Sequence, residues 1–348
     1  MSVDVVWSHE VDGYLDALGR GDRGSALDQV RSLRADGHDV PDLIRHLLGP
    51  AQLRVGELWV SDTWSVAREH AATAISESVL TALAVERERE VRPSADAPRV
   101  VVSCVEQEWH ALPALMLAEH LRGEGYAVSY LGANSSAQGL VRHVHELGPS
   151  AVLLSCSLSA FLPLARRQVE AVRETGTPVV VGGSAFDADG HRARVIGASA
   201  FATTAFGTRA LLESLPSAVP PAPPLTHPGA DEAYTVFGDR ETLADDVARI
   251  LVRSLADDPA GVGDDEAWLQ VLDDQLPHLV GSVAGALITD DPTIVSDALD
   301  WAEIVLRHRN APAATGRALR QALLEALHDL PVATRLMIGS MGQTDRPA

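Results

Sequence analysis

Short apolar runs alternate with helical segments between Arg99 and Gly183, and this alternation constrains the fold more than any other feature of the chain. The apolar runs, rich in valine and leucine, are 99–103, 127–131, 151–154 and 178–181. The segments with helical spacing between them are 112–121, 138–147 and 164–173. Strands that alternate with helices predict a doubly wound parallel sheet in a Rossmann-like α/β domain. Ligands bind such sheets at the carboxyl ends of the strands.

All-helical regions are predicted on both sides of this α/β domain, which we place at 98–212. In residues 1–92, apolar side chains recur at helical spacing and predict a four-helix bundle, with Asp62-Thr63 capping its last helix. The segment 213–232 contains six prolines and predicts a linker. Residues 233–348 predict a C-terminal helical domain, with helices at 241–255, 266–288, 293–309 and 315–330.

Composition and charge narrow the classes of function. The net charge of -20 disfavours nucleic-acid binding, because an acidic chain repels a phosphate backbone. No apolar run reaches the roughly 18 residues that a membrane helix needs. The first residues lack the basic flank and apolar core of a signal peptide. Two cysteines make no disulfide framework, so we expect a cytoplasmic protein without membrane or nucleic-acid partners.

A histidine follows the first predicted strand, in the sequence Glu108-Trp109-His110. A histidine at this edge of the sheet can present a neutral imidazole nitrogen to a metal. The carboxylate of Glu108, two positions earlier, can bind the other ring nitrogen and fix its tautomer. An ordinary surface or helix-capping histidine would give the same local pattern, so further features must decide.

Three further features follow the later strands. The second strand ends in 131–134, Ser155-Cys156-Ser157-Leu158 follows the third strand, and Gly182-Gly183 follows the fourth. In this order and spacing, residues 98–210 resemble the cobalamin-binding domain family, whose pattern is Asp-x-His-x-x-Gly, then Ser-x-Leu, then Gly-Gly. The resemblance implies that His110 is the lower axial ligand to cobalt and that Glu108 is its partner. It also implies that the channel for the nucleotide tail of the cofactor is lined by Ser155 or Ser157, together with Gly182 and Gly183.

The chain departs from the family pattern at three positions. Glu108 stands where the family has aspartate, and Pro113 stands where it has glycine. Because glutamate is longer, its contact with His110 is expected to be looser or mediated by water. If Ser155 begins the serine motif, Ser157 occupies the leucine position.

A second motif lies in the predicted bundle, where nine residues separate Trp59 from Glu69-His70. This Trp-x9-Glu-His pattern resembles that of light-sensing adenosylcobalamin repressors, which implies that Trp59 covers the upper adenosyl group and that Glu69 and His70 lie over it. Val60 stands where those repressors have a histidine that can ligate cobalt, which leaves His70 or water as a substitute. Trp59 could instead be a bundle core residue, with Glu69 and His70 in a helix N-terminal turn.

The order of domains resembles that of the photocobilins, photoreceptors that combine adenosylcobalamin with biliverdin in a C-terminal domain. The chain has no winged-helix segment ahead of the bundle and no cysteine beyond Cys156, so a bilin in the C-terminal domain would be noncovalent. His278 is the candidate for its pyrrole nitrogens, and Arg307 and Arg309 are candidates for its propionates. These arginines belong to a cationic set of Arg307, His308, Arg309, Arg317 and Arg320, which could equally stabilise helix ends or pair with acids.

These features together predict a light sensor that binds adenosylcobalamin and biliverdin. We expect it to form a homo-oligomer, to signal to a downstream protein and to have no catalytic output domain. The alternative is a corrinoid carrier for methyl transfer. A third possibility is a scaffold that keeps the cobalamin fold without the cofactor.

Overall fold

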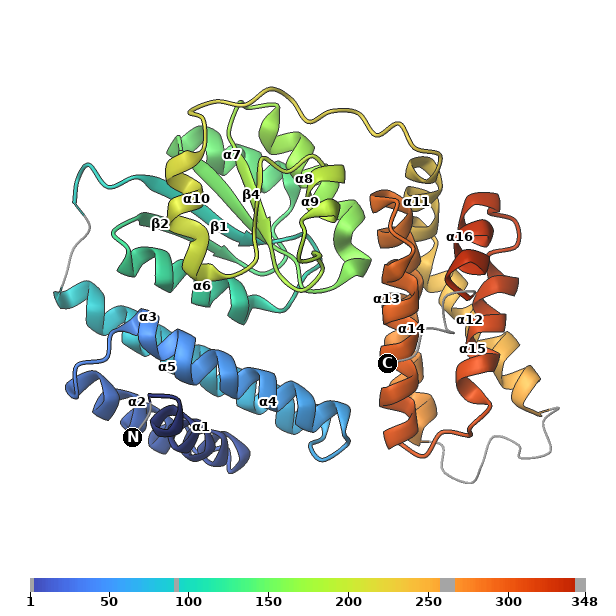
Figure 1. The fold of residues 1–348 in the computed structure, drawn as a ribbon, viewed down its shortest axis with the longest axis horizontal. Helices are drawn as coiled ribbons and strands as arrows, with labels where there is room; N and C mark the ends of the chain where they lie inside the picture. Colours follow the sequence, from blue (N-terminus) through green and yellow to red (C-terminus); the bar gives the residue numbers. More distant parts are fainter. Residues whose placement is uncertain (1–2, 91–93, 257–266, 342–348) are drawn as a thin grey trace.

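The computed structural model describes residues 3–90, 94–256 and 267–341, and it shows a helical cap, a Rossmann-like domain and a set of C-terminal helices (Figure 1). The cap buries a core that includes Tyr14, Leu18, Leu47 and Leu80. Its helices are α1 (Val3–Gly19), α2 (Arg23–Ala35), α3 (Val40–Leu43), α4 (Gly49–Val60) and α5 (Val66–Glu90). A π-helical turn, Ile44–Leu48, joins α3 to α4, so the predicted four-helix bundle is confirmed.

The turn between α4 and α5 differs from the prediction in one detail. Ser65, rather than Asp62 or Thr63, caps α5, because its Oγ accepts a hydrogen bond from the backbone N–H of Arg68 at 3.3 Å. Asp62 adopts a left-handed φ of 57° in the turn itself, which breaks the helix before a cap can form there.

The Rossmann-like domain contains a five-stranded sheet of order β2-β1-β3-β4-β5, and every strand pair is parallel. The strands are β1 (Arg99–Cys104), β2 (Ala127–Gly132), β3 (Ala151–Ser155), β4 (Val179–Gly182) and β5 (Ala200–Ala202). The helices are α6 (Ala111–Gly123), α7 (Ala137–Leu147), α8 (Leu162–Arg173), α9 (His191–Val195) and α10 (Thr208–Ser214). The predicted sheet is confirmed, and β5 is an additional edge strand that its three residues made too short to predict.

The register of the sheet brings the ends of its central strands to one level. Cys104 of β1 pairs with Ser155 of β3, which pairs with Gly182 of β4. The loops that carry His110, Ser157 and Gly183 therefore leave the same edge of the sheet.

The proline-rich segment runs along the Rossmann-like domain toward the C-terminal helices (Figure 1). Two buried arginines of α8 hold its backbone: Arg166 donates to the carbonyl of Pro223 at 2.7 Å, and Arg173 donates to that of Pro220 at 3.0 Å. The segment is thus extended, as its prolines predict, and is also anchored to the domain that it leaves.

The described residues of the C-terminal region, 229–256 and 267–341, form two more helices than predicted. These helices are α11 (Gly229–Gly238), α12 (Arg240–Ala256), α13 (Ala267–Thr289), α14 (Thr293–His308), α15 (Thr315–Ala326) and α16 (Pro331–Met341). The prediction missed α11 and α16. It also extended α15 to Leu330, whereas the helix ends at Ala326 and α16 begins at Pro331, a residue suited to a first helical turn.

The C-terminal helices share one hydrophobic core with the Rossmann-like domain. Helix α13 approaches the loop after β3 so closely that a Cβ on Gly285 would lie 2.2 Å from the carbonyl oxygen of Ser159. The hydroxyls of Ser159 and Ser282 are also hydrogen-bonded, at 3.1 Å. This contact fixes α13 beside the strand ends at which ligands bind such a sheet.

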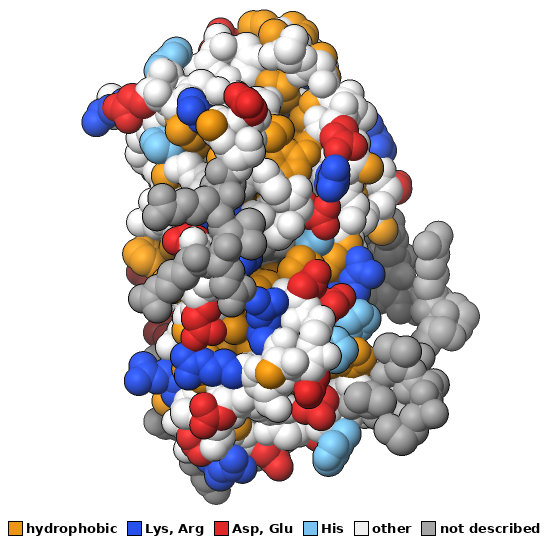
Figure 2. All heavy atoms as spheres, turned by 90° about the vertical axis from the view of Figure 1, so that its left-hand side faces the viewer, with side chains coloured by type: hydrophobic (Ala, Val, Ile, Leu, Met, Phe, Trp, Pro, Cys, Tyr) orange, Lys and Arg blue, Asp and Glu red, His pale blue; other side chains and the backbone are white. Residues whose placement is uncertain are grey.

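Two observations concern the surface. Among the described residues, no helix has both the length and the apolar character needed to cross a bilayer. Figure 2 shows acidic and basic side chains interspersed across one face, with apolar side chains exposed between them.

Candidate functional site

His110 lies at the N-terminus of α6, at the carboxyl edge of the sheet, and a buried glutamate holds its ring. Glu108 is 0% exposed, and its Oε1 accepts hydrogen bonds from His110 Nδ1 at 2.6 Å and from the His110 backbone N–H at 3.0 Å. The expected looser or water-mediated contact is wrong, because the loop brings the longer carboxylate directly to the ring. With Nδ1 engaged, Nε2 is the ring nitrogen left to bind a metal, and the His110 side chain is 58% exposed.

The second carboxylate oxygen of Glu108 binds the loop after β3. Its Oε2 accepts from the backbone N–H groups of Ser157 at 2.8 Å and Leu158 at 3.0 Å. Burial raises the pKa of Glu108, but the hydrogen bonds and the charge of His110, together with the Ser157 N–H, outweigh it and leave this pKa below its usual value. Glu108 is therefore an ionised carboxylate that links two strand ends through one side chain.

The electrostatics of His110 match those of a metal-binding imidazole with a carboxylate partner. The hydrogen bond to Glu108 raises the pKa of His110; burial opposes this shift, and the charges of Glu108 and Glu69 add to it. A more basic imidazole is a stronger donor to a metal once it is deprotonated. Within the described residues there is no cluster of three or more histidine, cysteine or acidic side chains, so His110 suits a metal whose other ligands come from a cofactor.

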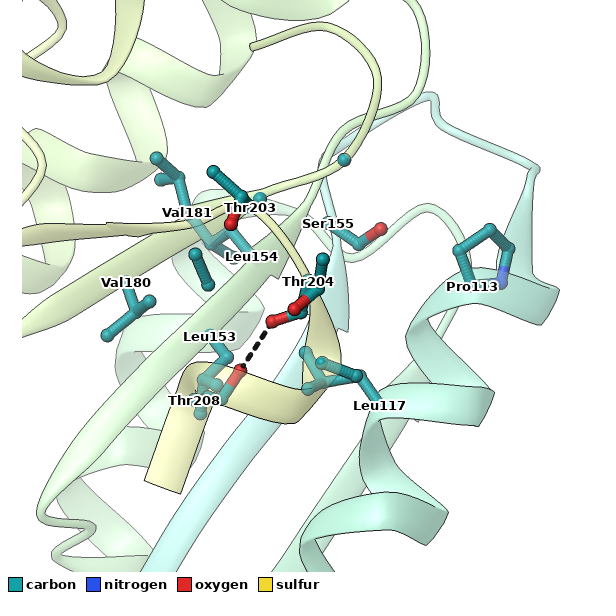
Figure 3. A pocket seen from close by; sticks show the side chains of 14 residues that line it. Pro113, Leu117, Leu153, Leu154, Ser155, Val180, Val181, Thr203, Thr204 and Thr208 are labelled. Carbon is teal, nitrogen blue, oxygen red and sulfur yellow. Dashed lines mark hydrogen bonds between the residues drawn. The ribbon is translucent and has the colours of Figure 1, made fainter. Parts of the chain in front are cut away.

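A cavity of about 180 Å³ opens between the sheet, α6 and the segment leading into α10 (Figure 3). Ser155, Gly182 and Gly183 line it, as expected for a channel that receives the nucleotide tail of a cobalamin. Its remaining lining includes residues that the sequence analysis did not identify, among them Leu117, Thr203, Thr204 and Thr208. No motif marks these residues, since they come from α6 and from the unpredicted region after β5.

Ser157 does not line this cavity, although the sequence analysis placed it there. The backbone N–H of Ser157 is held by Glu108, and its carbonyl accepts a hydrogen bond from Ser184 at 2.8 Å. These bonds turn the residue toward α13, where it lines a second cavity described below. Of the two serines, Ser155 is the one at the predicted channel.

The packing of the protein itself explains why Gly182 and Gly183 are glycines. Gly183 has a φ of +109°, and a Cβ there would lie 2.3 Å from the carbonyl oxygen of Cys156. A Cβ on Gly182 would lie 2.8 Å from the carbonyl oxygen of Ala202. Both glycines are therefore required by the close approach of neighbouring backbone.

Trp59 lies at the boundary between the cap and the C-terminal helices, so the alternative reading of Trp59 as a residue of the bundle core is wrong. The half-buried indole stacks on Trp301 of α14, with ring centroids 5.6 Å apart and an interplanar angle of 23°. Arg309 places its guanidinium 4.9 Å from the centroid of the Trp59 ring. Trp301 was missed by the sequence analysis, and no local pattern distinguishes it from any tryptophan on an amphipathic helix.

Glu69 and His70 occupy the first turn of α5. Glu69 accepts a hydrogen bond from Thr73 Oγ1 at 2.9 Å, and its Oε2 lies 3.5 Å from His70 Nε2. The charge of Glu69 contributes to the raised pKa of His110, after the larger contribution of Glu108. His70 is mostly exposed.

A second cavity, of about 380 Å³, lies between α13, α14 and the loop after β3. His278, Ser157 and Trp301 are among its lining residues. The cavity adjoins the His110 site, because its lining residues Ser157 and Leu158 donate their backbone N–H groups to Glu108. Burial lowers the pKa of His278, and the charge of His110 lowers it further.

The two arginines predicted to bind bilin propionates do not line this cavity. Arg307 is 70% exposed and pairs with Glu303 at 3.0 Å. Arg309 is 6% exposed and donates to the carbonyls of Trp59 and Val305, at 2.8 and 2.9 Å. The N–H groups of Arg309 therefore form hydrogen bonds at the contact between the cap and the C-terminal helices.

Family comparisons agree with this geometry. Residues 98–212 match the B12 binding domain family, and residues 10–84 match a second family that is also described as a B12 binding domain. The chain is thus a cobalamin-binding protein, with one B12-binding segment in the cap and one in the Rossmann-like domain.

Individual relatives are similar to parts of this chain. The chain is 32% identical over 142 residues to the HTH-type transcriptional repressor CarH of Myxococcus xanthus, a match that covers 40% of this chain and 46%, or about half, of the repressor. The fold is similar to that of the monomethylamine corrinoid protein of Methanosarcina barkeri, at 17% identity and a TM-score of 0.51, over 60% of this chain and 99% of that one. A cobalamin-binding protein from Desulfitobacterium hafniense DCB-2 aligns at 20% identity and a TM-score of 0.32, over 58% of this chain and 97% of that one.

Proposed function

We propose that the chain is a light sensor that binds adenosylcobalamin with His110 as the lower axial ligand, in the base-off form, together with biliverdin as a second chromophore. The observation that carries the proposal is the 2.6 Å bond between His110 Nδ1 and buried Glu108, which leaves Nε2 as the ring nitrogen that could bind a metal. The matches of residues 10–84 and 98–212 to B12 binding domains identify that metal as cobalt. The Trp-x9-Glu-His spacing of Trp59, Glu69 and His70, which resembles that of light-sensing adenosylcobalamin repressors, favours the adenosyl form.

The protein residues divide the work of binding between two faces of the cofactor. His110 and Glu108 serve the lower face, and the cavity at Ser155 and Gly183 takes the displaced nucleotide tail. Trp59 and Glu69 serve the upper face, where an indole gives a flat apolar surface and a carboxylate accepts hydrogen bonds from hydroxyls. When bound, adenosylcobalamin supplies a cobalt–carbon bond that light cleaves.

The cavity beside His278 is the site that we propose for biliverdin. Its volume of about 380 Å³ falls within the range of small-molecule pockets, roughly 300–1,000 Å³. Its lining combines apolar side chains with serine hydroxyls and the imidazole of His278, and it also includes the charged side chains of Arg192 and Asp297. Such a lining suits a long conjugated ligand with polar edges. Arg307 lies outside the cavity, so contact with a propionate requires the ligand to extend toward the surface.

The signal is proposed to leave the protein through a change in domain or subunit assembly. Removal of the upper group deprives Trp59 and Glu69 of the surface that they cover, and a differential contact of this kind shifts a conformational equilibrium. We propose no enzymatic step in this chain; a downstream signalling protein or a homo-oligomer would receive the change.

The test is an absorption spectrum of the full chain loaded with adenosylcobalamin in the dark, recorded before and after illumination, with and without biliverdin. We expect the adenosylcobalamin spectrum to convert on illumination, with an accompanying change in hydrodynamic size. A spectrum and size that stay constant under light would refute the sensor. A biliverdin spectrum that is unaffected by the protein would refute the second chromophore alone.

The alternative is a corrinoid carrier for methyl transfer. The similarity of the fold to that of the Methanosarcina barkeri corrinoid protein is compatible with this alternative. A carrier must open its upper face to a partner enzyme, whereas Trp59, which we propose to lie at that face, is held by Trp301 of α14 and by Arg309, the residue after α14. The affinities for the two cofactors separate these functions. Tighter binding of methylcobalamin than of adenosylcobalamin would favour the carrier.

A further inference from the structure

We infer that Arg309 and Trp301 hold Trp59 in position, so that a change of the upper axial group on the cobalamin is transmitted to α14. The three residues, which we call the α4–α14 joint, come from the end of α4 in the cap and from α14 and the residue after it. The inference rests on the proposed function for the placement of Trp59 beside the upper face. Arg309 and Trp301 are positioning residues here, since they act through Trp59.

The first half of the joint is a set of hydrogen bonds to the end of α4. The last carbonyls of a helix lack partners within it, and α4 ends at Val60. Arg309 donates from Nη2 to the carbonyl of Trp59 at 2.8 Å and from Nη1 to that of Val60 at 3.3 Å. A guanidinium also suits the negative end of the helix dipole. Because Arg309 is almost fully buried, little water competes for these bonds.

The second half of the joint is a pair of contacts to the Trp59 ring. Trp301 stacks on it at 5.6 Å, and the Arg309 guanidinium lies 4.9 Å from its centroid, within the reach of a cation–π interaction. Asp62, in the turn after α4, adds a carboxylate 3.7 Å from Arg309 Nε. The backbone and the ring of Trp59 are thus both held by the same region, and Trp59 cannot shift without disturbing it.

Arg309 and Trp301 connect the joint to other parts of the C-terminal domain. Nη1 of Arg309 also donates to the carbonyl of Val305 at 2.9 Å, so the same cation closes the last turn of α14. Trp301 lines the cavity of about 380 Å³ that contains His278. A displacement of Trp59 therefore loosens the end of α14 and moves one wall of that cavity.

The chain offers a matched control two residues before Arg309. Arg307 has the same charge and lies in the last turn of α14, but it is 70% exposed and pairs only locally with Glu303. A variant at Arg307 therefore removes a cation from the same helix end without touching Trp59. Any effect confined to Arg309 is then an effect of the joint.

The experiment is hydrogen–deuterium exchange of the full chain, loaded in the dark with adenosylcobalamin or with hydroxocobalamin. The variants are Arg309→Gln, Trp301→Leu and the control Arg307→Gln. We expect the backbone amides of α14 to exchange at different rates in the two loaded forms of the wild type and of Arg307→Gln. This difference should be lost in Arg309→Gln and reduced in Trp301→Leu. If Arg309→Gln shows no cooperative thermal transition, Trp301→Leu decides the result alone.

The outcomes separate the joint from the proposed sensor. Equal exchange of α14 in the two wild-type forms, or a wild-type difference that survives in both variants, would overturn the joint. Light on the adenosylcobalamin form then tests the sensor independently. If the two cofactors alter α14 in the dark while light leaves the adenosylcobalamin spectrum unchanged, the joint stands and the sensor fails.

Discussion

The proposed lower and upper sides of the cobalamin site are constructed in different ways. On the lower side, Glu108 binds His110 two residues away and Ser157 49 residues away, and both contacts lie within one sheet. On the upper side, Trp59 is held by Arg309, 250 residues along the chain, across a boundary between domains. Strand register sets the positions of the residues on the lower side, whereas those on the upper side depend on how two helical regions are placed.

This difference suggests a division of roles. A ligand positioned by a sheet edge and a buried carboxylate keeps the same geometry toward cobalt in every state of the cofactor. A side chain positioned by a contact between domains can respond when the axial group beside it changes, because the two domains can move apart and break that contact. Four predictions test whether the two sides are as distinct as this comparison holds.

The largest effect is expected from His110→Ala. Loss of an outer partner of a metal ligand costs about 10- to 100-fold in affinity, so loss of the ligand itself should exceed about 100-fold. Titration with hydroxocobalamin, followed by its absorption spectrum, measures this. The control is His145→Ala, at an exposed position on α7. Unchanged affinity and spectrum in His110→Ala would remove the axial assignment and support a scaffold.

Glu108→Gln tests the bond that fixes the lower ligand. Both oxygens of the Glu108 carboxylate accept hydrogen bonds from N–H groups. In the glutamine variant an NH₂ group replaces one of these oxygens and faces an N–H donor, so the ring of His110 loses its orientation. We expect cobalamin affinity to fall about 10- to 100-fold. Glu106→Gln, in the same loop, is the control. If both variants bind like the wild type, the carboxylate does not position His110.

Trp59→Ala tests the upper side. An aromatic contact contributes about 0.5–1.5 kcal/mol beyond its buried area, so adenosylcobalamin affinity should fall by about 2- to 12-fold. Affinity for hydroxocobalamin, which lacks the adenosyl group, should stay near the wild-type value. Leu53→Ala, at an exposed position on α4, is the control. An equal loss for both cofactors would show that Trp59 stabilises the cap rather than covering the adenosyl group.

The smallest effect is expected at the contact between the cap and α6, on which both sides depend. His120 is buried against Phe206 with both ring nitrogens unpartnered, and burial lowers its pKa. Arg45 also lowers this pKa, whereas Glu124 and Asp39 raise it. As the pH falls below about 6.5, the unfolded chain takes up a proton at His120 before the folded chain does. Stability is therefore present above this pH and decreases below it.

The measurement is the urea midpoint of the cobalamin-loaded protein between about pH 7.5 and 5. We expect the wild-type midpoint to fall toward acid pH and the midpoint of His120→Phe to fall less. Parallel curves for the two proteins would mean that His120 does not contribute to the acid sensitivity of this contact.

Much of the lower side could be predicted because its determinants are local. Each strand is a short apolar run followed within a few residues by the group that it presents, so His110, Ser155 and Gly183 could be placed at one sheet edge. The directness of the Glu108 contact could not be predicted, since it depends on the loop conformation and not on side-chain length. The same loop geometry moved Ser157 away from the predicted channel.

The upper side shows what a sequence leaves undetermined. Trp59 stood out through its spacing to Glu69, and Arg309 stood out as part of a cationic set. Nothing local indicated that these two residues meet, or that Trp301 joins them. Arg309 was therefore assigned to a bilin, and only its near-complete burial in the folded chain shows that its donors bind backbone carbonyls.

The sequence by itself determined the alternation of strands and helices, the helical cap and the placement of His110 at a ligand-binding edge. These features follow from the periodicity of apolar residues and from the rule that parallel strands end together. Tertiary structure alone decided what holds Trp59, which cavity Ser157 faces and why Gly183 must be glycine. Those outcomes depend on the approach of segments distant in the chain, and packing sets such approaches only when the whole core has formed.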